Sequence, residues 1–176
     1  EMLAGIPGSV GGAIIMNAGA YGGEISAYLI DIEIIRGGKI IIIPRAEAKF
    51  SYRNAAFDKN DVVISARFSM PEGDKAALEK TRSELILKRN SKHPVNYPNC
   101  GSVFKNLPEG PAAKYIEGAG LKGKQIGNAQ ASEKHANFII NLGGAAAADV
   151  YSLIVLIKKT VFEKFGIQLQ PEVKLL

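Results

Sequence analysis

The sequence predicts an α+β fold, in which strands and separate helices pack in layers. Runs of β-branched residues separated by turn signals fill much of the first part of the chain, and a long stretch with helical periodicity lies near its other end. The chain has 176 residues, of which 47% are hydrophobic, enough for one compact domain or two small ones. We expect two domains, residues 1–72 and 73–176, divided where Pro71-Glu72-Gly73-Asp74 interrupts the pattern.

The glycine-rich segment from Gly5 to Glu24 opens the first domain. Residues 5–8 predict a kinked loop, and Ser9 can cap a short helical turn that runs through Ala13 to Met16. Glycines allow close approach of the backbone to another body, and free N–H groups at a helix start suit phosphate. Turns and tight packing also use glycine, so both explanations stay open. The spacing differs from the Rossmann fingerprint, so a dinucleotide would have to bind through another fold.

Strands make up the rest of the first domain. A Gly-Gly pair between β-branched runs is typical of a hairpin, so residues 28–35 and 39–43 should pair through Arg36-Gly37-Gly38. Residues 46–50 predict a short helical turn, and residues 62–68 a further strand.

The second domain should combine helices with short strands. Asp74 caps a charged helix that runs to about Asn90, a shorter helix covers residues 112–117, and residues 136–141 and 167–170 predict strands. One helical face carries six apolar residues that should be core, with Gly166 as the C-terminal stop: Val150, Leu153, Ile154, Ile157, Val161 and Phe165.

Charge and cysteine content narrow the function classes. The net charge is +5, but apart from Lys88, Arg89 and Lys92 the basic residues are scattered, which favours a small anionic ligand over nucleic acid. The single cysteine, Cys100, excludes an internal disulfide and a cysteine-based zinc cluster, and we expect no metal site. No apolar run is long enough to cross a bilayer and no secretion signal is visible, so we expect a cytoplasmic protein.

Three segments carry polar groups that packing does not explain. They contain Arg53, Ser102 and Glu172, in Tyr52-Arg53, residues 100–106 and Pro171-Glu172-Val173. Taken singly, Arg53 could be a surface cation, Ser102 a turn residue and Glu172 a solvated carboxylate. Only their convergence in space would make a site.

Seven motifs in order resemble those of the UDP-N-acetylenolpyruvoylglucosamine reductases, bacterial flavoenzymes of peptidoglycan precursor synthesis, in their shorter type. The resemblance covers essentially the whole chain. The motifs lie at residues 5–13, 17–24, 51–53, 101–106, 119–123, 132–139 and 171–173.

The resemblance implies how the chain is organised. Members of the family begin with a further FAD-binding subdomain, which this sequence lacks. Residues 1–72 would be the remainder of the second FAD-binding subdomain, of PCMH type, and residues 73–176 an α+β substrate-binding domain. The missing N-terminal FAD-binding segment is therefore an expected partner. The chain alone should be inactive, and it should self-associate through the face left exposed.

The resemblance also implies a reaction, in which NADPH and FAD reduce UDP-N-acetylglucosamine enolpyruvate to UDP-N-acetylmuramate. Arg53 would grip the substrate carboxylate, Ser102 would donate the proton, and Glu172 would support the same intermediate through a hydrogen bond or in its protonated form. Residues implied to contact FAD are Gly5, Ile6, Pro7, Gly8, Ser9, Gly11, Gly12, Ala13, Asn17, Gly19, Ala20 and Tyr21. Residues implied to contact substrate are Tyr52, Lys92, Lys105, Asn106 and Gln130.

Two other functions stay open. One is an FAD-linked oxidase of the same superfamily, against which Ser102, Asn106 and Glu172 in their motifs argue. The other is a non-catalytic UDP-sugar-binding module. Departures from the family pattern at Ala55, Leu107 and Asn128 affect loop geometry more than reaction type, Cys100 has no assigned role, and we expect His135 to make structural hydrogen bonds.

Overall fold

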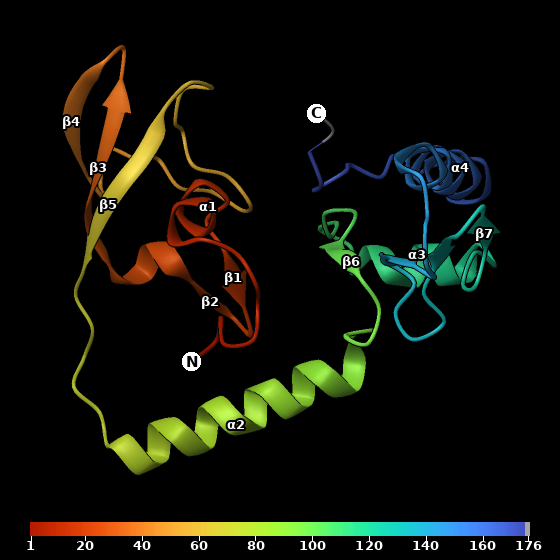
Figure 1. The fold of residues 1–176 in the computed structure, drawn as a ribbon, viewed down its shortest axis with the longest axis horizontal. Helices are drawn as coiled ribbons and strands as arrows, with labels where there is room; N and C mark the ends of the chain where they lie inside the picture. Colours follow the sequence, from red (N-terminus) through yellow and green to blue (C-terminus); the bar gives the residue numbers. More distant parts are fainter. Residues whose placement is uncertain (175–176) are drawn as a thin grey trace. The chain divides into compact units, whose positions relative to one another are not determined.

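The computed structural model describes residues 1–174 and divides the chain into two compact units, residues 1–87 and residues from 88 on. The helix α2 (Lys75–Lys92) runs from the first unit into the second (Figure 1). Each unit combines helices with antiparallel strands, which confirms the α+β class. The predicted boundary at residue 72/73 precedes α2, whereas the division between the units falls near its end.

The first unit is built on a three-stranded antiparallel sheet. Its central strand is β3 (Leu29–Arg36), flanked by β4 (Lys39–Pro44) and β5 (Val62–Phe68), as Figure 1 shows. The predicted hairpin is confirmed, because Gly37 and Gly38 have φ of 56° and 75° and Arg36 pairs with Lys39. One face of the sheet forms a core with the helix α1 (Val10–Ile15), and its buried members are Ile14, Leu29, Ile32, Ile34, Ile43 and Ala48.

Short elements connect α1 to the sheet. The strands β1 (Gly19–Ala20) and β2 (Gly23–Glu24) pair with each other, and the 3-10 helix η1 (Ile25–Tyr28) leads into β3. The cap is confirmed, since Ser9 Oγ accepts a hydrogen bond from Gly12 N at 3.1 Å.

The helical turn predicted at residues 46–50 is wrong. The chain makes a turn in which Glu47 N donates to Pro44 O and Ala48 N donates to Arg45 O. Lys49 then has φ of 43°, which a right-handed helix cannot contain, so the turn ends there.

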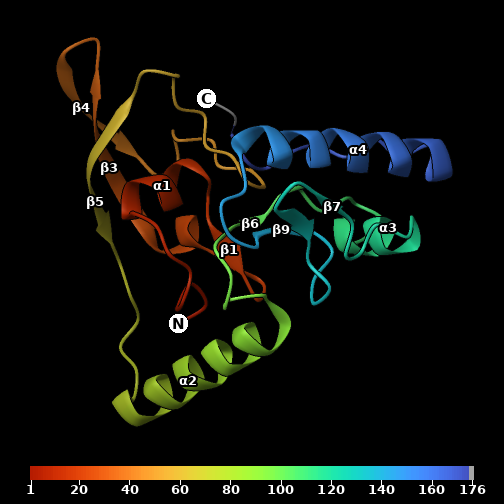
Figure 2. The same cartoon turned by 45° about the vertical axis from the view of Figure 1, so that its right-hand side comes forward.

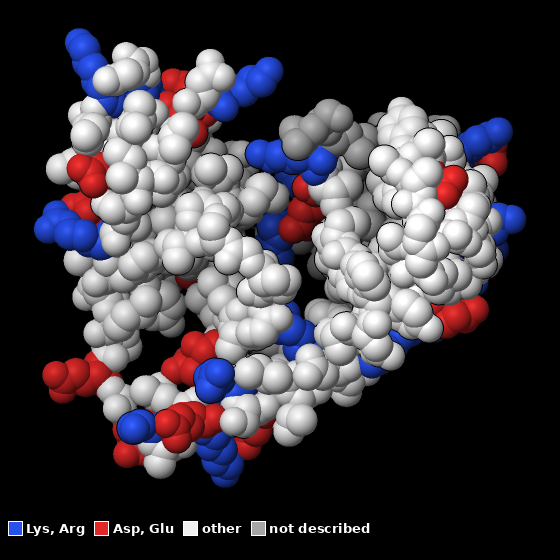
Figure 3. Space-filling view, in the orientation of Figure 1, with Lys and Arg blue, Asp and Glu red and all other residues white. Residues whose placement is uncertain are grey.

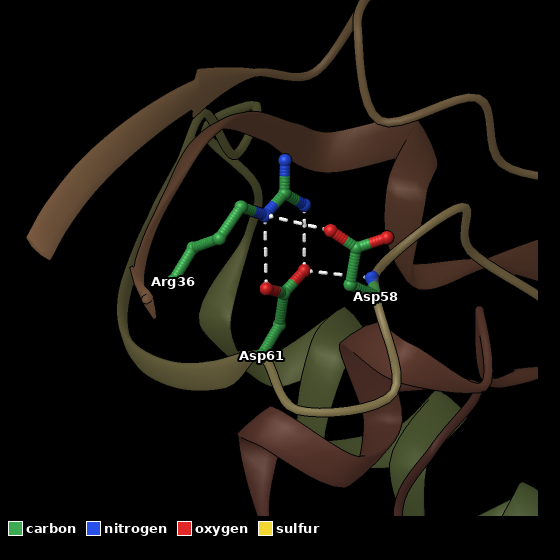
Figure 4. Close-up of polar contacts among 3 residues, drawn as sticks. All are labelled: Arg36, Asp58 and Asp61. Atoms are coloured by element: carbon green, nitrogen blue, oxygen red, sulfur yellow. Dashed lines mark hydrogen bonds and ion pairs between the residues drawn. The ribbon is translucent and has the colours of Figure 1, made fainter. Parts of the chain in front are cut away.

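An ion cluster joins the β3–β4 hairpin to the loop before β5. Arg36 donates from Nε to Asp61 Oδ1 at 2.9 Å and from Nη2 to Asp61 Oδ2 at 2.6 Å, and its Nε lies 3.2 Å from Asp58 Oδ2 (Figure 4). The hydrogen bond from Arg36 is the largest cause that lowers the pKa of Asp61 below its usual value. The Asp61 side chain is only 2% exposed, so its pair with Arg36 is the covered part of the cluster.

The second unit packs two helices against a four-stranded antiparallel sheet. The strand order is β6 (Asn99–Ser102), β9 (Phe138–Asn141), β8 (Ala129–Ala131) and β7 (Gln125–Ile126). The helix α4 (Ala147–Phe165) lies alongside α3 (Ala112–Gly118) and contacts β7 and β8 (Figure 2). Four of the six residues predicted from helical spacing are its buried residues, and Val150 is half-buried against the same core: Leu153, Ile154, Ile157 and Val161 are buried.

The end of α4 agrees only in part with the sequence prediction. Gly166 ends the helix with φ of 70°, as expected, and its N–H bonds to Phe162 O. The prediction that Phe165 is core is wrong, because its side chain is 40% exposed. It lies at the last turn, where it packs edge to face against Tyr115 with the ring centroids 5.8 Å apart.

Two strand predictions need correction. Residues 167–170 form no strand, and their segment pairs only through a single bridge between Phe104 and Pro171. The strand predicted at residues 136–141 begins two residues later, since Ala136 and Asn137 form a turn. Both predictions came from apolar runs whose backbone lacks a partner strand along their full length.

The surface carries mixed charge. Lys and Arg side chains lie at separate points of the face shown in Figure 3, interspersed with acidic ones. Within residues 1–174, no helix combines the length and apolar character that crossing a membrane requires. In the same described part of the chain, no group of three or more His, Cys, Asp or Glu residues is arranged to hold a metal ion.

Candidate active site

The structure brings the segments of Ser102 and Glu172 side by side in the second unit. Ser102 is the last residue of β6 and pairs with Phe138 of β9. Two residues later the chain meets its C-terminal segment, where Glu172 N donates to Val103 O at 2.8 Å. Ser102 and Glu172 are both half-buried. Glu172 is thus hydrogen-bonded to the residue that follows Ser102, although Ser102 and Glu172 lie 70 positions apart in the sequence.

Pro171 occupies a position in this pairing that requires no backbone N–H donor. It lies opposite Phe104 in an antiparallel bridge, and the two hydrogen bonds of that bridge come from its flanks. These are Glu172 N to Val103 O and Lys105 N to Gln170 O, at 2.8 and 2.9 Å. Proline has no N–H to donate, so a position that needs none accepts it. The rigid proline then fixes the backbone from which Glu172 projects.

Asn137 holds the other side of the Ser102 segment. Its Oδ1 accepts from Phe104 N at 2.9 Å, its Nδ2 donates to Phe104 O at 2.8 Å, and its backbone O accepts from Val103 N at 2.8 Å. Asn137 is only 2% exposed. Sequence reasoning gave it no role, although a polar residue inside an apolar run is a signal of a buried, hydrogen-bonded side chain.

Arg53 lies in the first unit, at the tip of a tight turn. Ser51 and Asn54 exchange both backbone hydrogen bonds across the turn, at 2.9 and 3.1 Å, and Arg53 has φ of 53°. The guanidinium lies 4.9 Å from the centroid of the Tyr52 ring, and its Nη2 donates to Gly19 O at 3.0 Å. Arg53 is therefore attached to the glycine-rich segment. Its convergence with Ser102 and Glu172 stays a prediction.

Asn17 connects the glycine-rich segment to the Arg53 turn. It is completely buried, with φ of 41°, and its Nδ2 donates to Glu24 Oε2 at 2.7 Å and to Ser51 O at 3.1 Å. Its Oδ1 has no hydrogen-bond partner among the described residues. Asn17 Oδ1 is therefore a buried acceptor that the described residues leave unsatisfied.

The glycines proposed to contact FAD are of two kinds. Gly8 has φ of 142°, and a Cβ built on it would meet no atom within 4 Å, so its backbone is open to an approaching group. At Gly19 a Cβ would lie 2.5 Å from Gly23 O, so glycine is needed there for contact within the protein. Of the other FAD candidates, Tyr21 is exposed and its hydroxyl donates to Leu85 O at 3.4 Å. FAD contact by residues 5–21 stays a prediction.

The substrate candidates of the second unit are partly engaged in the scaffold. Asn106 Oδ1 accepts from Ala112 N at 3.1 Å, at the start of α3, and Gln130 Nε2 donates to Gly123 O at 3.2 Å. Lys92 is exposed at the end of α2, and Lys105 is half-buried. Tyr52 belongs to the first unit and is exposed. Contact of these five residues with substrate stays a prediction.

Two histidines pack against Phe138 beside β9. The rings of His93 and His135 have centroids 5.5 Å apart, and each ring lies 4.8 Å from that of Phe138. Burial lowers the pKa of both imidazoles, and the neighbouring His135 lowers that of His93 further. The prediction was structural hydrogen bonding by His135, but its buried Nδ1 has no hydrogen-bond partner among the described residues, and the ring packs against His93 and Phe138.

Comparison with known proteins identifies the relatives of this chain. The family model described as "UDP-N-acetylenolpyruvoylglucosamine reductase, C-terminal domain" matches residues 93–176. The whole chain is 47% identical to the UDP-N-acetylenolpyruvoylglucosamine reductase of Exiguobacterium sibiricum. Residues 93–176 thus match the C-terminal domain of UDP-N-acetylenolpyruvoylglucosamine reductases, and the whole chain is similar to part of such a reductase. This similarity confirms the resemblance seen in the seven sequence motifs.

Other members of the reductase family agree. The UDP-N-acetylenolpyruvoylglucosamine reductase of Latilactobacillus sakei is 48% identical over the whole chain. The crystal structure of UDP-N-acetylenolpyruvylglucosamine reductase from Thermus caldophilus matches with a TM-score of 0.87 and 33% identity over 98% of the chain, and 62% of that structure is covered. The chain spans 59% of the length of the two curated reductases.

Proposed function

We propose that the protein containing this chain reduces UDP-N-acetylglucosamine enolpyruvate to UDP-N-acetylmuramate, with NADPH as the hydride source and FAD as the carrier. Similarity to the UDP-N-acetylenolpyruvoylglucosamine reductases supports the reaction class. The observation that carries the proposal is the hydrogen bond from Glu172 N to Val103 O, because it sets the Glu172 segment beside Ser102. The two segments that would supply the proton donor and the carboxyl group therefore run side by side in the second unit.

The glycine-rich segment fits FAD in its chemistry. Gly8 offers a backbone with no atom in the way, and the buried Asn17 Oδ1 lacks a donor. Residues 5–13 would hold the cofactor through backbone N–H groups. Asn17 would support this segment through its hydrogen bonds to Glu24 and Ser51. When bound, FAD would accept a hydride from NADPH and deliver it to the enolpyruvyl group.

The reaction adds two hydrogens across one carbon–carbon double bond. A hydride joins the methylene carbon, the π electrons move to the neighbouring carbon, and the adjacent carboxylate shares the charge. Arg53 suits this state because its guanidinium is always ionised and can bind a carboxylate through two parallel N–H groups. The Tyr52 ring and Gly19 O orient the guanidinium in the first unit.

Ser102 would complete the reduction. Its hydroxyl proton passes to the carbanion carbon, a C–H bond forms, and the serine alkoxide regains a proton from water. Serine is a weak acid, so the step needs a strongly basic carbon and groups that stabilise the alkoxide. Glu172 would stabilise the same carbanion intermediate through a hydrogen bond or in its protonated form, because an ionised carboxylate would oppose the developing negative charge.

The test is the substitution Ser102→Ala in the full-length protein. Reduction of the flavin by NADPH should keep its rate, because that step needs no proton from Ser102. Reoxidation by substrate should slow about 100-fold or more, the range in which removal of a general acid falls. Stopped-flow absorbance measures both half-reactions separately.

A matched control is Ser83→Ala, which removes an exposed hydroxyl that bonds only to Glu79 O on α2. This variant should reoxidise as the unsubstituted protein does. Normal reoxidation in Ser102→Ala would overturn the role of Ser102. Substrate binding without any turnover in the unsubstituted full-length protein would favour the UDP-sugar-binding module instead.

A further inference from the structure

Asn137 stands at the point where the ladder between β6 and β9 ends. Ser102 pairs with Phe138, the first residue of β9, and the preceding Asn137 lies in a turn. The backbone of Asn137 still accepts from Val103 N at 2.8 Å, but it cannot serve the next residue of the Ser102 segment. The buried N–H and C=O of Phe104 therefore need another partner.

The side chain of Asn137 supplies that partner. A carboxamide has a donor and an acceptor in the same plane, as a peptide group does. Its Oδ1 and Nδ2 bind Phe104 N and Phe104 O at 2.9 and 2.8 Å, so it acts in place of one further strand residue. Phe104 is 1% exposed and Asn137 is 2% exposed, so water cannot take over these bonds.

The opposite side of the same segment meets the Glu172 segment. Val103 O accepts from Glu172 N, and Lys105 N donates to Gln170 O. Residues 103–105 are thus held between Asn137 on one side and residues 170–172 on the other. A shift of this segment would move Ser102 and Glu172 relative to each other, and small displacements of reacting groups reduce rates steeply.

We propose that Asn137 is a positioning residue for protonation of the substrate: its amide fixes the Phe104 backbone, and through it the placement of Ser102 against Glu172. The inference rests on the proposed function, because it assigns Asn137 to that same site. Asn137 itself need not touch substrate.

The test compares Asn137→Asp with Asn141→Asp in the full-length protein. At Asn137 the substitution removes the Nδ2 donor and sets a carboxylate oxygen against Phe104 O. At Asn141 only Oδ1 is used, accepting from Gly143 N at 2.8 Å and Ala145 N at 3.0 Å, and a carboxylate still accepts both. The control thus makes the same chemical change a few residues away and leaves its hydrogen bonds in place.

Near neutral pH, N137D should reoxidise with substrate about 10- to 100-fold more slowly while NADPH reduces its flavin at the normal rate. N141D should be normal in both half-reactions. A protonated carboxyl restores the lost donor, so reoxidation by N137D should recover as the pH is lowered through the pKa of its new, buried carboxyl. A general loss of folding would instead slow both half-reactions.

Hydrogen exchange measured by mass spectrometry gives a readout that does not depend on activity. The peptide covering residues 99–106 should exchange faster in N137D than in N141D. If N137D does not accumulate, the uncharged Asn137→Ala should show the same faster exchange and the same selective loss of reoxidation.

The outcomes separate the two proposals. Normal reoxidation and normal exchange in N137D or N137A would overturn the positioning role and leave the reductase function standing. Equal slowing of both half-reactions, without recovery in acid, would also overturn it. If substrate fails to reoxidise the unsubstituted protein, the proposed function falls, and the positioning role falls with it.

Discussion

In both units, single asparagine side chains fix the local backbone through hydrogen bonds. Asn17, Asn137 and Asn106 each use a carboxamide to satisfy backbone or side-chain groups that regular structure leaves open. Asn137 both donates and accepts, whereas Asn17 donates from its Nδ2 and Asn106 accepts through its Oδ1. Sequence inspection marked Asn17 and Asn106 as ligand contacts and passed over Asn137. Residue type alone does not say whether an amide faces a ligand or a neighbouring backbone.

At this scale the Arg36–Asp61 pair predicts a pH effect on stability. Asp61 has a pKa below its usual value in the folded state, chiefly because Arg36 donates to it. The stability it contributes is present above the unfolded pKa, near 3.8, and is lost as the pH falls through the lower folded pKa. Asp61→Asn should therefore lower the Tm at pH 7 by a few degrees, and the difference should shrink below about pH 4.

The control for this prediction is Asp58→Asn, which affects the same arginine. The Asp58 side chain is 73% exposed, so its ion pair is screened by water and its loss should change the Tm little. Thermal melts across pH 3–7 compare the two variants. Equal Tm values for both at pH 7 would contradict the assignment.

At the scale of elements, close backbone contacts decide which glycines the fold itself needs. The pair β1 and β2 is so tight that a Cβ on Gly19 would lie 2.5 Å from Gly23 O, a backbone atom that cannot move aside. A Cβ on Gly11, in α1, would meet Val63 at 3.5 Å, an ordinary contact. Both glycines belong to the glycine-rich segment, yet of the two only Gly19 is required by packing.

Gly19→Ala should therefore destabilise the protein by about 1–3 kcal/mol, in the range of overpacking. Gly11→Ala should leave stability unchanged or raise it, by up to about 1 kcal/mol, because alanine favours the helix. Urea unfolding monitored by circular dichroism measures both. A Gly19→Ala protein as stable as the unsubstituted one would contradict the tight β1–β2 contact.

At the scale of the whole molecule, the outer face of the first sheet is unusually apolar. Ile35, Ile40 and Val62 are neighbours across the three strands, and Ile42 and Ile64 extend the patch. All five are exposed, from 39% for Ile35 to 65% for Ile40. Exposed apolar patches favour association, and β4 is also an edge strand that can pair with another chain.

We expect the isolated 176-residue chain to self-associate in a concentration-dependent way. The double substitution Ile40→Lys and Ile42→Lys on β4 should reduce this association, because charges on an exposed edge oppose pairing. A matched control is Val155→Lys, on the exposed face of α4 in the second unit, which should not reduce it. Light scattering after gel filtration gives the mass of each, and a monomer at all concentrations would contradict the expectation.

Elements with strong local signals could be predicted from sequence. Gly37-Gly38 marked the hairpin, Ser9 and Asp74 marked helix starts, and the spacing from Leu153 to Val161 marked the buried face of α4. Local backbone preference and apolar periodicity act within a few residues, so they can be read without a structure. The seven motifs likewise indicated the family.

Only the tertiary structure decided what lies beside what. Nothing local to residues 167–170 says that their run will lack a partner strand, or that Pro171 will face Phe104 through a single bridge. The same holds for the hydrogen bonds that Asn137 makes across 33 positions of the chain. Such contacts form between groups that are far apart in the sequence and close together only in the folded state, so local sequence preferences do not reveal them. These contacts place Glu172 beside the Ser102 segment.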